Sequence, residues 1–219
     1  MSPLIPVLAT PLLGFVVLAG MGHRVQGRNI NVVFSLGTFL AASILTVRIV
    51  SDGPIFALDG QFFIDSLNIF LVTLTAFIGF TTSLFSRPYM RIEEERGKMT
   101  PNRMRLYFSM YQLFSFCMLL ALSTNNMGIL WVSMEAATLA TVLLVSVYRT
   151  PSSLEAAWKY FILCGVGIAQ ALLGTILLYM AAQRVIPGGV NPLLWTNLNE
   201  AKFLLNPVIM SLAFVFLFV

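Results

Sequence analysis

The most informative part of the sequence for the fold is NNMGILWVSMEAATLATVLLVSVYR, residues 125–149. Before its final arginine it carries a single charged side chain, Glu135. Apolar runs of about 18 or more residues are typical of helices that cross a membrane. The run extends back to Leu106, which is too long for one helix, and the turn-forming residues 123–126 divide it. We therefore expect two membrane-spanning helices, over 106–122 and 127–148.

The same pattern recurs along the rest of the chain. Further spanning helices are predicted over 3–21, 30–47, 66–85, 153–182 and 199–219. Asn206-Pro207 predicts a kink in the last of them, because proline lacks a backbone donor. Turn residues and short apolar runs in 51–65 predict a small hairpin on one membrane face. The expected fold is an all-α, polytopic membrane bundle of about seven helices, forming a single membrane domain over residues 1–219.

The composition agrees with a membrane protein. Of 219 residues 58% are apolar and 10% are charged, whereas a soluble domain has about 45–50% and about 25%. This balance leaves too little polar surface for a soluble enzyme, a nucleic-acid-binding domain or a disordered chain. Cys117 and Cys164 lie in apolar stretches and are expected to be free thiols.

The distribution of basic residues predicts the orientation. The loops after the first, third and fifth segments hold nine of them: Arg24, Arg28, Arg87, Arg91, Arg96, Lys98, Arg103, Arg105 and Arg149. The opposite face has only Arg48, Arg184 and Lys202. Because basic loops stay in the cytoplasm, the N-terminus is predicted to lie outside. The formal net charge of +4 therefore reflects topology.

Glu135 is the side chain that packing explains least. It lies about 12 Å from one end of its helix and about 20 Å from the other, too deep for so short a side chain to reach water by bending. A charged acid at that depth costs about 2.5–3.5 kcal/mol on insertion scales. We expect an ion or proton site. The alternative is a protonated acid that hydrogen-bonds a neighbouring helix.

Lys159 is a second candidate, about two turns into the sixth segment. It can extend to the cytoplasmic surface and pair with Glu155, four residues earlier. Gln170 lies at a membrane depth close to that of Glu135, where it can bind water or hold two helices together. Ser152 and Glu155 have the spacing of a capping box that starts this segment. The one histidine, His23, lies in a loop, which argues against haem or a multi-histidine metal site.

Two strings beside these residues resemble a known family. They are the opening stretch and SSLEAAWKYFILCGVGIAQALLGTILLYMA, residues 152–181. Both are similar to the antiporter-like membrane subunits of the complex I superfamily, and most of all to hydrogenase-4 component F. The segment ALDGQFFIDSLNIFLVTLTAFIGFTTSLFSRPYM, residues 57–90, resembles the third-helix region of that family.

The resemblance implies a proton-translocating subunit of a membrane-bound [NiFe] hydrogenase, formate hydrogenlyase or complex I-like assembly. A fifth-helix glutamate of the family matches Glu135, and a sixth-helix lysine found in some members matches Lys159. In the family this couple is thought to change proton affinity during the redox cycle. Members have about fourteen helices in two inverted repeats, so this chain resembles an incomplete first repeat.

The resemblance also implies partners and a location. No cofactor is expected in this chain, while Fe–S clusters and NiFe or flavin are expected in partner subunits. The partners would be other membrane subunits and a peripheral redox arm, in the inner (cytoplasmic) membrane of a prokaryote. Two alternatives stay open: a non-conducting structural membrane subunit, and a subunit of a multisubunit cation/proton antiporter.

Overall fold

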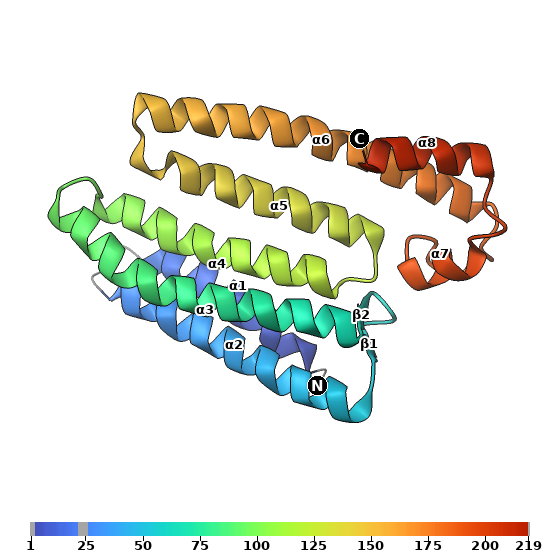
Figure 1. Ribbon diagram of the computed structural model, residues 1–219, viewed down its shortest axis with the longest axis horizontal. Helices are drawn as coiled ribbons and strands as arrows, with labels where there is room; N and C mark the ends of the chain where they lie inside the picture. The colour runs from blue at the N-terminus through green and yellow to red at the C-terminus, as the bar shows by residue number, and fades with distance from the viewer. Residues whose placement is uncertain (1–2, 22–25, 219) are drawn as a thin grey trace.

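The computed structural model describes residues 3–21 and 26–218, and almost all of them lie in helices (Figure 1). Within these two ranges, six helices are long and apolar enough to cross a membrane. They are α1 (Leu4–Met21), α2 (Gly27–Asp52), α3 (Ser66–Glu95), α4 (Pro101–Ser123), α5 (Met127–Val145) and α6 (Pro151–Gln183). The 3-10 helix η1 (Ser146–Tyr148) extends α5 by one turn. The predicted all-α polytopic fold is confirmed.

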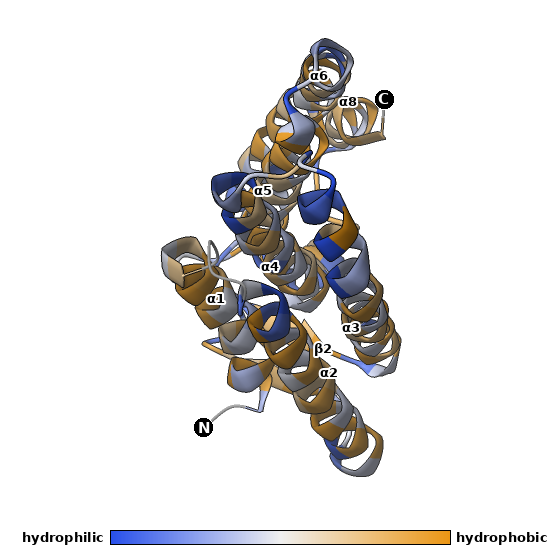
Figure 2. Cartoon of the chain, turned by 90° about the vertical axis from the view of Figure 1, so that its left-hand side faces the viewer, coloured by the Kyte–Doolittle hydropathy of each residue, from blue (hydrophilic) through white to orange (hydrophobic). Residues whose placement is uncertain are grey.

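The helices divide into a packed group and an extension. In the packed group, α4 contacts α1, α2 and α3, and it also contacts α5 on its other side. The extension consists of α5 and α6. Among the described elements, α6 packs mainly against α5, η1 and the C-terminal helix α8 (Pro207–Phe218). Viewed along the helices, α5 and α6 lead away from the other four (Figure 2). Much of the surface of α5 and α6 is therefore uncovered by this chain.

Local signals set the starts of the long helices. Asp65 caps α3 by accepting hydrogen bonds from the N–H groups of Leu67 and Asn68. Thr100 caps α4, and Asn126 caps α5. Each of these side chains satisfies backbone donors that the first helical turn leaves unpaired. The turn chemistry of residues 123–126 thus ends α4 and starts α5.

The start of α6 differs from the expected capping box. The cap is Thr150, not Ser152, and its hydroxyl accepts from the N–H of Ser153. The Ser153 hydroxyl in turn accepts from the N–H of Thr150. Proline is favoured at the first helical position, so Pro151 moves the cap one residue before it. Glu155 therefore lies beyond the capping position.

The 51–65 segment contains a short antiparallel hairpin, β1 (Ile55–Ala57) paired with β2 (Phe62–Ile64). Its turn meets two other loops at the same end of the molecule. Asn125 donates its backbone N–H to the Gln61 carbonyl, and Asn126 donates its side-chain amide to Gln61 Oε1. Trp195 N–H bonds the Asn125 carbonyl, and Met127 N–H bonds the Leu193 carbonyl. We call these contacts the outer clasp.

The 199–219 segment is not one helix. The structure divides it into α7 (Trp195–Ala201) and α8 (Pro207–Phe218), separated by turns around Leu204. Asn206 caps α8 through the N–H groups of Val208 and Ile209. The asparagine–proline pair therefore starts a new helix where the sequence predicted a kink.

The basic loops gather at the end opposite the outer clasp. The turns between α3 and α4 and between α5 and α6 lie there (Figure 1), and hydrophilic residues mark this end of the helices (Figure 2). The helices between the two ends are largely apolar. His23 and Arg24 lie outside the described residues.

Candidate functional site

Two side-chain hydrogen bonds join α5 to α6. Trp131 Nε1 donates to the Ile168 carbonyl at 2.7 Å. Thr141 Oγ1 donates to Tyr160 Oη at 3.0 Å, nearer the basic end. The two bonds are ten residues apart on α5 and eight apart on α6, so they fix the register of the two helices. Both candidate charged residues lie on these two helices.

Glu135 lies on α5 between these two bonds and is half-buried. The side of α5 that packs on α4 carries the buried residues Ser133, Ala137 and Ala140. Glu135 is two positions from Ser133 and from Ala137, which places it on roughly the opposite side of the helix. Within the described part of the chain its carboxyl has no hydrogen-bond or ion-pair partner. Hydrocarbon cannot solvate a carboxyl, so this side of α5 needs water or protein from elsewhere.

Lys159 lies on α6 near the basic end, and its ammonium group contacts Glu155. Lys159 Nζ lies 2.5 Å from Glu155 Oε1, and the two side chains are 70% and 65% exposed. This is the i,i+4 pair that the spacing predicts. Exposed pairs of this kind contribute only about 0.3–0.5 kcal/mol. No hydrogen bond or ion pair joins Lys159 to Glu135 among the described residues.

Gln170 is exposed and makes no side-chain hydrogen bond among the described residues. It shares an uncovered face of α6 with Lys159, Leu163 and Val166, all of them exposed. Gln170 therefore does not join two of the described helices. Any interface that contains Gln170 needs a partner other than the described helices.

Small residues recur at helical spacing along α6, at Gly167, Ala171 and Gly174, and this stripe has two different environments. Gly174 is buried against α8, where an added Cβ would lie 2.7 Å from Leu217 Cγ and 3.0 Å from the Ala213 carbonyl oxygen. An added Cβ on Gly167 would meet nothing within 4 Å. Close packing is therefore present at one end of the stripe and absent, in this chain, at the other.

Sequence reasoning missed a polar cluster between α2 and α4. Gln112 Nε2 lies 2.9 Å from Asn31 Oδ1, 3.0 Å from Ser35 Oγ and 3.1 Å from the Asn31 carbonyl oxygen. All three residues are buried, and Asn31 Nδ2 is a buried donor without a partner among the described residues. We call Asn31, Ser35 and Gln112 the polar seam. Asn31, Ser35 and Thr38 recur at helical spacing, a signal that marks one polar face.

No family model matches the chain. It is 44% identical over 214 residues to the hydrogenase-4 component F homolog of Methylacidiphilum infernorum, a match that covers 97% of this chain and 44% of that protein. The chain thus spans less than half the length of this curated relative.

Two solved structures share the fold. One is the membrane-bound sulfane sulfur reductase, an archaeal respiratory membrane complex, with a TM-score of 0.83 and 20% identity over 98% of this chain and 43% of the matched chain. The other is respiratory complex I from Thermus thermophilus with bound Aureothin, with a TM-score of 0.68 and 22% identity over 96% of this chain and 42% of that chain.

The sequence match and the shared fold extend over nearly the whole chain and agree with the resemblance found in its fifth and sixth segments. The protein is a multi-pass membrane protein that is similar in sequence to part of the hydrogenase-4 component F homolog and shares the fold of the two solved structures.

Proposed function

We propose that the chain is a proton-translocating membrane subunit of a redox-driven assembly of the complex I or group 4 hydrogenase type. The observation that carries the proposal is Glu135, an acid near the middle of a spanning helix with no partner among the described residues. Such an acid is costly in a membrane and marks a functional site by default. Its half-buried position on α5, on the side away from α4, allows water, or a group from another part of the assembly, to reach the carboxyl.

In this proposal Glu135 carries the proton and Lys159 adjusts its proton affinity. A cation near a carboxyl favours the charged form, and its removal favours protonation. The Lys159–Glu155 pair is exposed and weak, so the lysine can leave it at little cost. In this proposal the Lys159 side chain extends along α6 towards Gln170 and approaches Glu135 through an intervening water. It then returns to its pair with Glu155.

The redox chemistry belongs to other subunits. The described residues contain no group of three or more His, Cys, Asp or Glu side chains that would suit a metal ion. Because the chain shares its fold with chains of two respiratory complexes, we propose that Fe–S clusters, and NiFe or flavin, lie in a peripheral redox arm, with further membrane subunits beside α5 and α6. The proposed location is the inner (cytoplasmic) membrane of a prokaryote.

The test is Glu135→Gln in the complete assembly, with proton uptake followed in inverted membrane vesicles during redox turnover. We expect at least a tenfold loss of proton translocation per electron, because the amide cannot take up a proton, with the subunit still present in the purified complex. Glu200→Gln, an exposed acid of α7, is the matched control and should leave translocation unchanged.

Other outcomes point to the alternatives. Unchanged proton translocation in Glu135→Gln would contradict the proposal and favour a non-conducting structural subunit. Sodium-dependent transport that needs no redox partner would contradict it in favour of a cation/proton antiporter subunit.

A further inference from the structure

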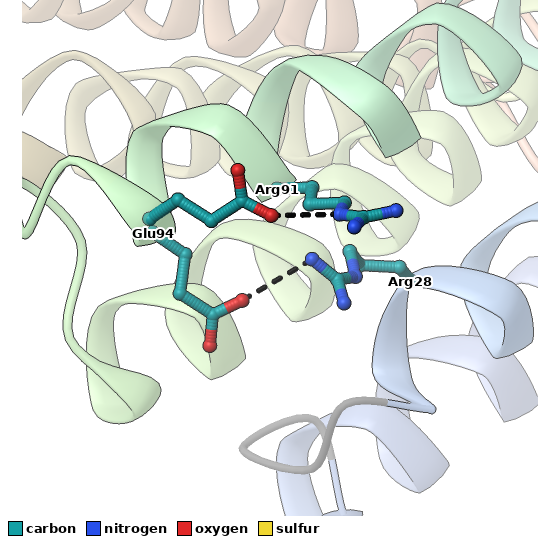
Figure 3. Close-up of polar contacts among 4 residues, drawn as sticks. Arg28, Arg91 and Glu94 are labelled. Atoms are coloured by element: carbon teal, nitrogen blue, oxygen red, sulfur yellow. Dashed lines mark hydrogen bonds and ion pairs between the residues drawn. The ribbon is translucent and has the colours of Figure 1, made fainter.

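A cavity of about 480 Å³ lies at the basic end, between the start of α2 and the last turns of α3. Its lining consists of Arg28, Asn29, Arg87, Pro88 and Arg91. Figure 3 shows Arg28 and Arg91 close together, each directed at a carboxylate. We call the cavity the arginine pocket. It shares no residue with α5 or α6, so it is separate from the proposed proton site.

The arginine pocket has an excess of positive charge. Arg28 pairs with Glu94 at 3.2 Å and Arg91 pairs with Glu95 at 2.8 Å. Arg87 has no ion-pair partner among the described residues. Two carboxylates against three guanidinium groups leave one positive charge, on Arg87. The pocket therefore favours an anion, and a planar guanidinium suits a phosphate.

The depth of the pocket matches a membrane surface. Counted from the outer ends of the helices, Arg87 is about 32 Å along α3 and Arg28 is about 36 Å along α2. The hydrocarbon core of a bilayer is about 30 Å thick, so both arginines lie at the level of lipid headgroups. Arg28 is held there rigidly, with a side chain only 14% exposed.

Exposed apolar side chains continue from the pocket towards the middle of the membrane. Val33 lies one turn beyond Asn29 on α2 and is 66% exposed. Leu84 lies one turn before Pro88 on α3 and is exposed, as is Phe85. A free inorganic anion would leave these apolar side chains uncovered, whereas acyl chains attached to a bound phosphate would cover them.

We propose that the arginine pocket binds the phosphate headgroup of an anionic phospholipid in the cytoplasmic leaflet. Arg87 is its main ligand, Arg28 is the fixed second donor, and the acyl chains lie along Val33 and Leu84. Basic pockets between membrane helices on the cytoplasmic side are suited to such headgroups. The proposal rests on the orientation given by the basic loops, and it does not depend on proton transfer.

The test measures lipid binding to the purified protein in a zwitterionic detergent. Fluorescent phosphatidylglycerol is titrated onto the protein, with fluorescent phosphatidylcholine as the neutral comparison. We expect at least a fivefold preference for phosphatidylglycerol. Arg87→Gln should reduce phosphatidylglycerol affinity about fivefold, because one basic residue near the surface contributes about that factor.

Arg105→Gln is the matched control, since Arg105 is an exposed basic residue of the same end that does not line the pocket. It should change the affinity less than twofold, and Arg87→Lys should lie between the wild type and Arg87→Gln. Equal losses in the Arg87 and Arg105 variants would overturn the proposal, because they would indicate unspecific attraction. So would the absence of a lipid preference, or full displacement of the lipid by millimolar inorganic phosphate, which would identify a free-anion site. Unfolding temperatures of the variants, measured beside the titrations, identify any loss due to misfolding.

Discussion

The polar seam and the Glu135 side of α5 are both polar regions within membrane helices, but their surroundings differ. Gln112 is buried and places its amide among acceptors from the neighbouring helix α2. Glu135 is half-buried, faces away from α4 and has no partner among the described residues. A polar group whose partners lie within the chain holds helices together. A polar group that this chain leaves open depends on water or on another component of the assembly.

The largest difference in stability is expected between two variants that each remove an amide, one in the polar seam and one on the exposed face of α6. Gln112→Leu is expected to lower the free energy of unfolding by about 2 kcal/mol, because Asn31 and Ser35 lose their interhelical partner in a dry site. Gln170→Leu, the exposed counterpart on α6, should change it by less than about 0.5 kcal/mol. Denaturant unfolding in matched detergent micelles measures both. Equal effects would mean that the polar seam does not hold α2 to α4.

A smaller difference is expected within α6, which has both kinds of environment. Gly174→Ala should cost about 1–2 kcal/mol, because its Cβ would press on the Ala213 carbonyl and the Leu217 backbone of α8. Gly167→Ala has open space around it and should be neutral or slightly stabilising. Thermal unfolding in the same micelles separates the two variants. A destabilised Gly167→Ala would show that this end of α6 is covered within the chain.

The smallest effect is expected at the basic end of α6. Glu155→Gln removes the pair with Lys159 and should change stability by less than about 0.5 kcal/mol, because both side chains are exposed. In the complete assembly the same variant should shift the pH dependence of proton translocation, since Lys159 then lacks its resting partner. A stability loss of several kcal/mol in Glu155→Gln would contradict the weak pairing on which that exchange depends.

Hydropathy predicted the long helices because the thickness of a bilayer imposes a length that a sequence has to satisfy. The depth of Glu135 and the Glu155–Lys159 spacing also followed from single helices, since 1.5 Å per residue is enough to calculate them. The polar seam could not be predicted from single helices, because it depends on the register of α2 against α4. The break between α7 and α8 was missed for a local reason. Asn206-Pro207 was interpreted as a kink within one helix, whereas Asn206 caps the start of a new helix.

The orientation of Glu135 relative to the neighbouring helices also could not be predicted from the sequence. The charge pattern gave its depth, but the side of α5 that it occupies depends on how α4 packs against Ser133 and Ala137. The role of Glu135 in proton transfer remains a prediction that the transport experiment tests.

The outer clasp has a consequence for the order of biogenesis. Gln61, Asn125 and Trp195 leave the ribosome at widely separated times. The Asn125–Gln61 bond needs only the first two residues, whereas the Trp195–Asn125 bond also waits for the start of α7. The helices from α1 to α4 have every one of their mutual partners once Ser123 has been synthesised. Because long-range contacts wait for their last partner, the clasp closes late. The nascent chain therefore has every partner of its four-helix group first, and the outer clasp is complete only after the start of α7 has been made.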